Sequence, residues 1–206
     1  MNSKLLKKAW HFIWDDNSIW SWLANIILAF VLIKFIVYPG LGFVFGTNFP
    51  IVAVVSGSME HGGAFEQWWN GPCCFDQKCT IKKTQTEIYN KWRINKEKYT
   101  SFPFTSGFNK GDIMILVGPK NLKQGDVLVF MAQGRIDPII HRLVDIRTTN
   151  IQTVYNTQGD NNCGAIADFE KNISEEKLLG KAYLKIPLLG WLKIWFVQLI
   201  TMMGLV

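Results

Sequence analysis

The chain has 206 residues and a formal net charge of +6, from 22 lysines and arginines against 16 aspartates and glutamates. This length suits one ordinary domain with an anchor, and the positive charge raises the question of a nucleic-acid partner. The basic residues are dispersed rather than interleaved with aromatic residues along one face, so we expect no nucleic-acid partner. Lys4, Lys7 and Lys8 precede the first apolar segment, where the cytoplasmic flank of a membrane helix carries positive charge.

The first apolar segment covers residues 19–38 and predicts a transmembrane helix. About 20 helical residues, rising roughly 1.5 Å each, cross a hydrocarbon core about 30 Å thick. Pro39 and Gly40 are expected to end the helix. The segment is longer than the apolar region of a cleaved signal peptide, and no A-x-A-like cleavage site follows it. A buried core helix is the alternative, because Asn25 and Lys34 are polar.

The positive charge before this helix predicts a cytoplasmic segment over residues 1–18, with the chain from about residue 41 on the outer side. Short apolar, β-branched runs follow and predict strands at 51–55, 112–117, 126–131, 139–146 and 151–155. No strong helical pattern separates them, which favours an antiparallel sheet or a partly open barrel over a parallel α/β sheet. We therefore expect a mainly-β extracytoplasmic domain over residues 41–186.

Two segments depart from the strand pattern. Residues 62–109 are rich in aromatic residues, and they predict an inserted subdomain with a weak helical pattern around 86–97. Residues 188–206 are apolar again and predict a helix that either spans the membrane or lies at its surface.

Ser58, directly after the first predicted strand, is the candidate nucleophile. A serine hydroxyl needs a base to take its proton, and His141 is the best candidate because it stands in an otherwise apolar strand. The alternative is that His141 has only a structural role, as a lone histidine on a strand more often does. His61 is a weaker candidate for the base, because it lies only three residues from Ser58. A carboxylate must hold the imidazole tautomer. Asp160 and Asp168, on loops after the later strands, are the candidates for that role.

These segments together resemble the type I signal peptidases. SGSM at 56–59 is similar to their nucleophile box, and GDIMILV at 111–117 and GDVLVF at 125–130 are similar to their paired Gly-Asp strands. IHRLVDI at 140–146 is similar to their base box, and GDNN at 159–162 to their acidic box. The bacterial branch has a lysine as base, whereas His141 followed by Arg142 resembles the archaeal and endoplasmic-reticulum branch. The insert at 62–109 departs from the family, which passes from the nucleophile box to the first Gly-Asp strand within a few residues.

The resemblance implies a signal-peptidase-like antiparallel β domain and a membrane-bound serine endopeptidase that removes signal peptides from secretory preproteins. It implies Ser58 as nucleophile, His141 as general base and Asp160 as acidic partner, with Asp168 as the second candidate. It also implies that the Ser56 hydroxyl and the Ser58 backbone N–H hold the oxyanion.

Met59, flexible and apolar, is expected to rest against lipid or to help wall a substrate pocket. We expect no cofactor and no metal, because the CC-x4-C cysteine pattern lacks the second pair of a zinc site.

The expected location is the cell membrane, crossed once or twice, with the catalytic domain on the outer side and the lipid membrane as a partner. All four cysteines fall on that side, where disulfides persist, and their pairing is open: Cys73, Cys74, Cys79 and Cys163. The role of the insert is also open.

The alternative function is a non-catalytic, membrane-anchored β module that binds a protein partner through the aromatic insert around Trp68 and Trp69.

Overall fold

The computed structural model describes residues 3–72, 83–150, 152–162 and 167–204. The chain divides near Val44 into an N-terminal helical unit and a C-terminal β domain. All four cysteines lie outside the described residues, so their pairing remains as open as the sequence left it.

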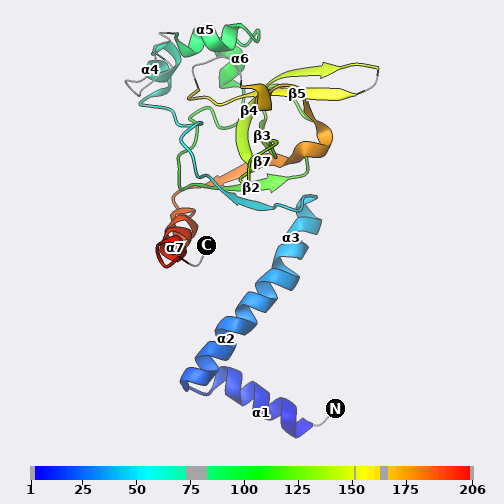
Figure 1. Ribbon diagram of the computed structural model, residues 1–206, viewed down its shortest axis with the longest axis vertical. Coiled ribbons are helices and arrows are strands. Elements are labelled where there is room, and N and C mark those ends of the chain that lie inside the picture. The colour runs from blue at the N-terminus through cyan, green and yellow to red at the C-terminus, as the bar shows by residue number, and fades with distance from the viewer. Residues whose placement is uncertain (1–2, 73–82, 151, 163–166, 205–206) are drawn as a thin grey trace. The chain divides into compact units, whose positions relative to one another are not determined.

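One long apolar helix dominates the N-terminal unit. After α1 (Ser3–Trp14), α2 (Ile19–Leu32), the π-helical turn η1 (Ile33–Val37) and α3 (Tyr38–Phe45) follow without a break (Figure 1). The helix from Ile19 to Phe45 has 27 residues, contains an 18-residue window with a mean hydropathy of 2.2, and is long enough to cross a membrane.

The apolar helix does not end at Pro39, where the sequence predicted its end. In the π-helical turn the Tyr38 N–H donates to the Ile33 carbonyl, five residues back. A proline ring clashes with the carbonyl four residues back in a regular α-helix. The wider π-helical turn directly before Pro39 relieves that clash, so the helix continues to Phe45.

Two polar side chains of the apolar helix bind the end of α1. The Ser21 hydroxyl donates to the Phe12 carbonyl at 2.6 Å, and the Asn25 amide donates to the Ile13 carbonyl at 2.9 Å. The last carbonyls of a helix lack partners within it, and these two side chains supply them. Asn25, which favoured a buried core helix, thus has a local partner within an otherwise apolar segment.

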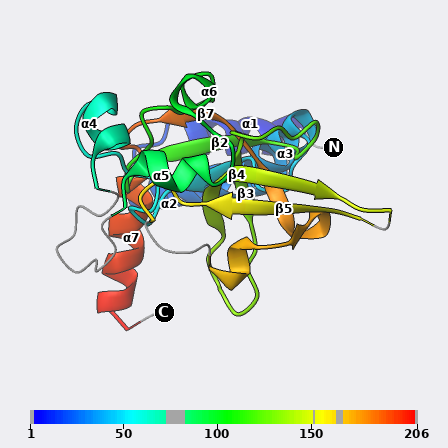
Figure 2. The ribbon, with the colours of Figure 1, turned by 90° about the horizontal axis from the view of Figure 1, so that it is seen from above.

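The β domain holds a seven-stranded, fully antiparallel sheet, which confirms the predicted fold class. The strands are β1 (Ile51–Ala53), β2 (Ile113–Val117), β3 (Val127–Phe130), β4 (Ile139–Thr148), β5 (Thr153–Gln158), β6 (Ile173–Ser174) and β7 (Leu178–Ile186). Their order across the sheet is β1-β2-β7-β3-β4-β5-β6. The β4–β5 hairpin extends beyond the rest of the sheet (Figure 2).

Strand β7 was not predicted, although it lies between β2 and β3. Gly180, Lys181 and Lys185 interrupt its apolar residues, so neither a continuous apolar run nor a clean alternation marks it. The strand is nevertheless central, because it pairs with β2 on one side and β3 on the other.

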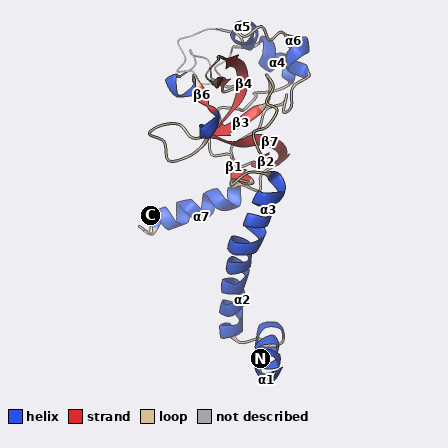
Figure 3. Cartoon of the chain, turned by 90° about the vertical axis from the view of Figure 1, so that its right-hand side faces the viewer, coloured by secondary structure: helices blue, strands red, loops and turns tan. Residues whose placement is uncertain are grey.

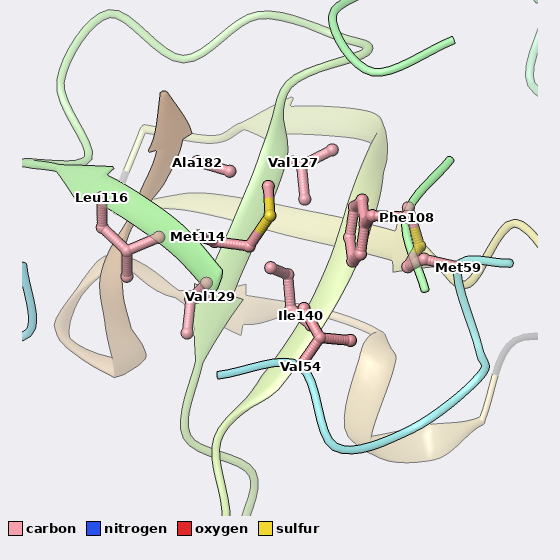
Figure 4. Packing of buried hydrophobic residues seen from close by; sticks show 9 residues of the cluster. All are labelled: Val54, Met59, Phe108, Met114, Leu116, Val127, Val129, Ile140 and Ala182. Carbon is pink, nitrogen blue, oxygen red and sulfur yellow. The ribbon is translucent and has the colours of Figure 1, made fainter. Parts of the chain in front are cut away.

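The main hydrophobic core joins both ends of the insert to the sheet. Met59, before the insert, and Phe108, at its end, lie together at the margin of the cluster (Figure 4). The other buried members are Val54, Met114, Leu116, Val127, Val129, Ile140 and Ala182. The Phe108 N–H also donates to the Met59 carbonyl, at 3.1 Å, so the insert leaves and rejoins the domain at one place.

Three short helices form the described part of the insert: α4 (Phe65–Asn70), α5 (Gln85–Asn90) and α6 (Lys96–Thr100). The helical pattern predicted around 86–97 is thus two helices. Arg93, with a φ of 56°, breaks the run, and the Asn95 side chain caps α6. The helices lie beside β4, whose Val144 packs into their aromatic cluster (Figure 3).

The C-terminal apolar segment contains one helix, α7 (Trp191–Met202), joined to the sheet where the Gly190 N–H donates to the Gly111 carbonyl at 2.8 Å. Ile194 is buried, whereas most large apolar residues of α7 are exposed: Leu192, Trp195, Phe196, Val197, Leu199 and Met202. Its 12 residues rise about 18 Å, well short of a hydrocarbon core about 30 Å thick.

Candidate active site

Ser58 and His141 meet although they come from distant segments of the chain. Ser58 lies in the turn after β1, His141 lies in β4, and 83 positions separate them in the sequence. His141 Nε2 and Ser58 Oγ are 2.9 Å apart. The histidine is 5% exposed and the serine half-buried, so the pair is sheltered but reachable. The two residues that sequence analysis singled out are within hydrogen-bonding distance.

The other nitrogen of His141 is bound by Glu170. His141 Nδ1 makes a short hydrogen bond with Glu170 Oε1, and Glu170 is 2% exposed. Glu170 ends the 3₁₀-helix η2 (Asp168–Glu170), and its second oxygen accepts the Ala167 N–H at 3.2 Å. Ser58, His141 and Glu170 therefore form a continuous hydrogen-bonded chain of hydroxyl, imidazole and carboxylate.

Neither aspartate considered as partner of His141 touches it. Asp168 is fully exposed and forms an ion pair with Lys171 at 2.9 Å. Asp160 is 0% exposed and is bound by Arg142, the residue after His141. Successive side chains of a strand point to opposite faces, so a partner of Arg142 lies away from the His141 ring. Glu170 occupies the place that sequence analysis assigned to these aspartates.

Four side chains bind the Asp160 carboxylate. Arg142 donates through Nε at 2.9 Å and Nη2 at 2.8 Å. The hydroxyls of Tyr89 and Tyr99 donate at 2.5 Å and 2.8 Å, and His61 Nε2 lies 2.8 Å away. An ionised carboxylate only accepts hydrogen bonds, so His61 donates through Nε2.

Arg142 is the counter-ion of Asp160, and both side chains are fully buried. Burial by itself raises the pKa of Asp160, but the Arg142 guanidinium and the hydrogen bond from His61 outweigh it and hold that pKa well below its usual range. The remaining N–H groups of Arg142 bind carbonyl oxygens, those of Pro103, Phe104 and Gly125. Burial, followed by the nearby Asp160 charge, raises the pKa of both Tyr89 and Tyr99, which keeps their hydroxyls as donors.

We expect the Asp160→Asn substitution to lower the free energy of unfolding by about 3–5 kcal/mol, because it leaves the Arg142 charge buried without its counter-ion. Urea unfolding of the full chain in detergent micelles, followed by circular dichroism, measures the loss. Asp168→Asn is the control and should leave the free energy of unfolding unchanged within error, because Asp168 is fully exposed. Equal stability of Asp160→Asn and the unsubstituted chain would contradict this assignment.

The loss of unfolding free energy in Asp160→Asn should depend on pH. The pKa of Asp160 is lower in the folded chain than in the unfolded chain, where it is about 3.9. Its contribution to stability is therefore fully present above that value and disappears as the pH falls through the folded-state pKa. The difference between the unsubstituted chain and Asp160→Asn should be largest near neutral pH and should shrink in strong acid.

Ser56 and Met59, expected beside the oxyanion or the substrate, have different surroundings. Ser56 is exposed, and its Oγ lies 3.2 Å from Ser58 Oγ. Met59 is 0% exposed within the main core, and its sulfur accepts the Asp160 N–H at 3.3 Å. Met59 therefore neither lines the pocket beside Ser58 nor reaches lipid, because its side chain points into the domain.

Trp68 and Trp69 do not form a binding surface. They are 0% and 2% exposed, and they pack with Tyr89, Tyr99 and Val144. The alternative of a protein partner that binds through these two tryptophans is therefore not supported, because both indole rings are buried inside the protein.

A pocket of about 300 Å³ opens beside Ser58 and His141. One wall is the end of β1 with Ala53 and Val55, and the other is the start of β4. Phe169, next to Glu170, closes one side, and the Arg135 guanidinium lies over its ring at 4.6 Å from the ring centre. A cavity of this size, lined by both apolar and polar residues and next to a serine and a histidine, suits a side chain of a bound peptide.

The curated relatives that match the chain include proteins from two yeasts and a malaria parasite, all with the name signal peptidase complex catalytic subunit SEC11. The protein of Scheffersomyces stipitis is 26% identical over 174 residues, which is 81% of this chain and 78% of the relative. That of Plasmodium falciparum is 31% identical over 94 residues, 43% of this chain and 51% of the relative. That of Schizosaccharomyces pombe is 37% identical over 76 residues, 34% of this chain and 40% of the relative. No protein-family model matches the chain.

The fold and these similarities define a hydrolase of the signal peptidase class. The predicted resemblance is confirmed: the chain is a homologue of signal peptidase complex catalytic subunits, of the endoplasmic-reticulum branch of the type I enzymes. The names of these relatives and the apolar helix from Ile19 to Phe45 also indicate membrane association.

Proposed function

We propose that the protein is a membrane-anchored serine endopeptidase that removes signal peptides from secretory preproteins, with Ser58 as nucleophile and His141 as general base. The observation that carries the proposal is the line of Ser58, His141 and Glu170 beside a small pocket. The relatives support the substrate class, since each is named as a catalytic subunit of a signal peptidase complex.

The hydrogen bonds of His141 suit a general base. An ionised Glu170 only accepts, so His141 carries its hydrogen on Nδ1 and leaves Nε2 free to take the Ser58 proton. Ser58 Oγ then attacks the scissile carbonyl carbon and forms an acyl-enzyme. His141 passes the proton to the leaving amine, and water, activated by the same imidazole, hydrolyses the ester. Glu170 stabilises the imidazolium while it exists.

The negative oxygen of the intermediate needs donors next to Ser58. The Ser58 backbone N–H has no acceptor among the described residues, and the Ser56 hydroxyl is 3.2 Å from the nucleophile. Both groups are thus available for an oxyanion, which supports the role that the resemblance gave them.

The substrate binds as an additional strand beside β1. Among the residues that the structure describes, this strand pairs with β2 alone, so its other edge is open to a peptide backbone. Backbone hydrogen bonds hold any sequence, and the pocket between Ala53 and Phe169 receives the side chain next to the cleaved bond, which the resemblance to the type I signal peptidases implies is small.

Cut-site mapping tests this substrate class. A model preprotein with alanine before the cut should be processed by the full chain in proteoliposomes, and mass spectrometry of the product should place the new N-terminus directly after that alanine. The same preprotein with phenylalanine there should be cleaved at least about 10-fold more slowly, because the resemblance to the type I signal peptidases implies a small residue before the cut. Equal cleavage of both preproteins, or cuts scattered along the chain, would contradict the proposal.

The membrane arrangement follows from three segments. The apolar helix from Ile19 crosses the bilayer, with the N-terminus cytoplasmic and the β domain on the outer side. In α1, lysines cover one face and exposed apolar residues, among them Leu5 and Trp10, cover the other, which suits a helix lying at the cytoplasmic surface. At its length, α7 lies in the outer interface rather than across the membrane. Because the relatives are named as subunits, the protein works within a complex.

A further inference from the structure

Several side chains of the insert converge on Asp160 of the β domain. Of the four side chains that bind the Asp160 carboxylate, Tyr89 and Tyr99 lie in α5 and α6, and His61 directly precedes the insert. The Gln85 amide, also from α5, donates to the backbone carbonyl of Asp160 at 2.7 Å. Tyr89 and Tyr99 are 0% exposed and Gln85 is 1% exposed, so these contacts exclude water.

Stacked rings fix the direction of these donors. The His61 ring lies parallel to Trp68, with centres 3.6 Å apart and planes at 8°. The Tyr99 ring lies 4.8 Å from the Arg142 guanidinium carbon. An interlocked, buried hydrogen-bond network of this kind holds its members in one arrangement.

The neighbours of Asp160 contact the backbone of the Ser58 turn and lie against the His141 ring. At Gly159 an added Cβ would stand 2.9 Å from His141 Nε2, so the backbone lies against the imidazole. The Asn161 N–H donates to the Ser58 carbonyl at 2.8 Å, and its side-chain amide donates to the Gly57 carbonyl at 3.0 Å. Residues 159–162, here called the catalytic loop, thus hold the serine turn and flank the base.

We propose that the insert is a positioning subdomain: through Tyr89, Tyr99 and His61 it holds Asp160, and through Asp160 it fixes the catalytic loop against Ser58 and His141. The inference rests on the proposed function for its kinetic consequence, but its structural part can be measured without activity. Tyr89 and Tyr99 are positioning residues, because neither touches Ser58 or His141.

A double variant, Tyr89→Phe with Tyr99→Phe, tests the proposal. It keeps both rings and removes two of the donors to Asp160. Hydrogen exchange of the full chain in detergent micelles should become at least about 10-fold faster in residues 159–162, with strands β2 and β3 unchanged. Cleavage of the model preprotein should show a kcat about 10²-fold lower with KM within about twofold, because a displacement near 1 Å has that cost.

Tyr155→Phe is the matched control, since Tyr155 is also buried, at 7% exposure, but packs in a different cluster. It should leave both measurements unchanged. Unchanged exchange in residues 159–162 of the double variant would overturn the inference whether or not the chain cleaves preproteins, while absence of cleavage by the unsubstituted chain would overturn the proposed function alone. If the double variant does not fold, the single Tyr89→Phe decides by the same exchange measurement.

Discussion

The Ser58→Ala variant is expected to lower the kcat for preprotein cleavage by about 10⁶-fold, because removal of the nucleophile or its base abolishes the whole covalent route. His141→Ala should have a similar effect, since no other imidazole reaches Ser58 Oγ among the described residues. The two losses should not add in a double variant, because both residues serve the same step. Quantified processing of a preprotein in proteoliposomes measures each effect.

Two control variants match these changes. Ser101→Ala removes an exposed hydroxyl whose bond is local, to the Lys98 carbonyl, and His11→Ala removes an exposed imidazole from α1. Both should retain normal processing. Normal processing by Ser58→Ala or by His141→Ala would instead refute the proposed mechanism.

Glu170→Gln is expected to lower kcat by about 10⁴-fold. The glutamine occupies the same space but presents an amide, which allows the His141 tautomer whose Nε2 carries the hydrogen and cannot take the Ser58 proton. It also removes the negative charge that stabilises the imidazolium. Kinetics of preprotein cleavage measure the effect, which should appear in kcat with little change in KM.

Asp168→Asn distinguishes the two carboxylates of the same 3₁₀-helix. Asp168 is fully exposed and its side chain forms an ion pair with Lys171, so its replacement should leave kcat within about twofold. If Asp168→Asn lost activity and Glu170→Gln kept it, the assignment of Glu170 as the partner of His141 would be wrong.

The sequence predicted the features that depend on local patterns. The β-branched runs located β1 to β5, and the boxes around Ser58 and His141 identified two residues that the structure brings to 2.9 Å. Each of these signals needs only a few consecutive residues, whether an apolar run that forms a strand or a short motif.

Features that depend on distant contacts escaped prediction. Glu170 was missed because three acidic residues share the region from 160 to 170, and only the turn of η2 determines which one faces His141. The role of the insert was equally hidden. Nothing local marks Tyr89 and Tyr99 as partners of an aspartate 71 and 61 positions further along.

The position of β7 has a consequence for the order in which the protein can assemble during synthesis. Within the described part of the chain, the β1–β2 pair and the four strands β3 to β6 share no ladder of their own, and β7 joins them. Until residues 178–186 leave the ribosome, the nascent domain has two unpaired strand edges open to wrong pairing. The proposed active site takes Ser58 from the segment after β1 and His141 from β4, so it can form only once β7 has been synthesised and has joined the two groups of strands.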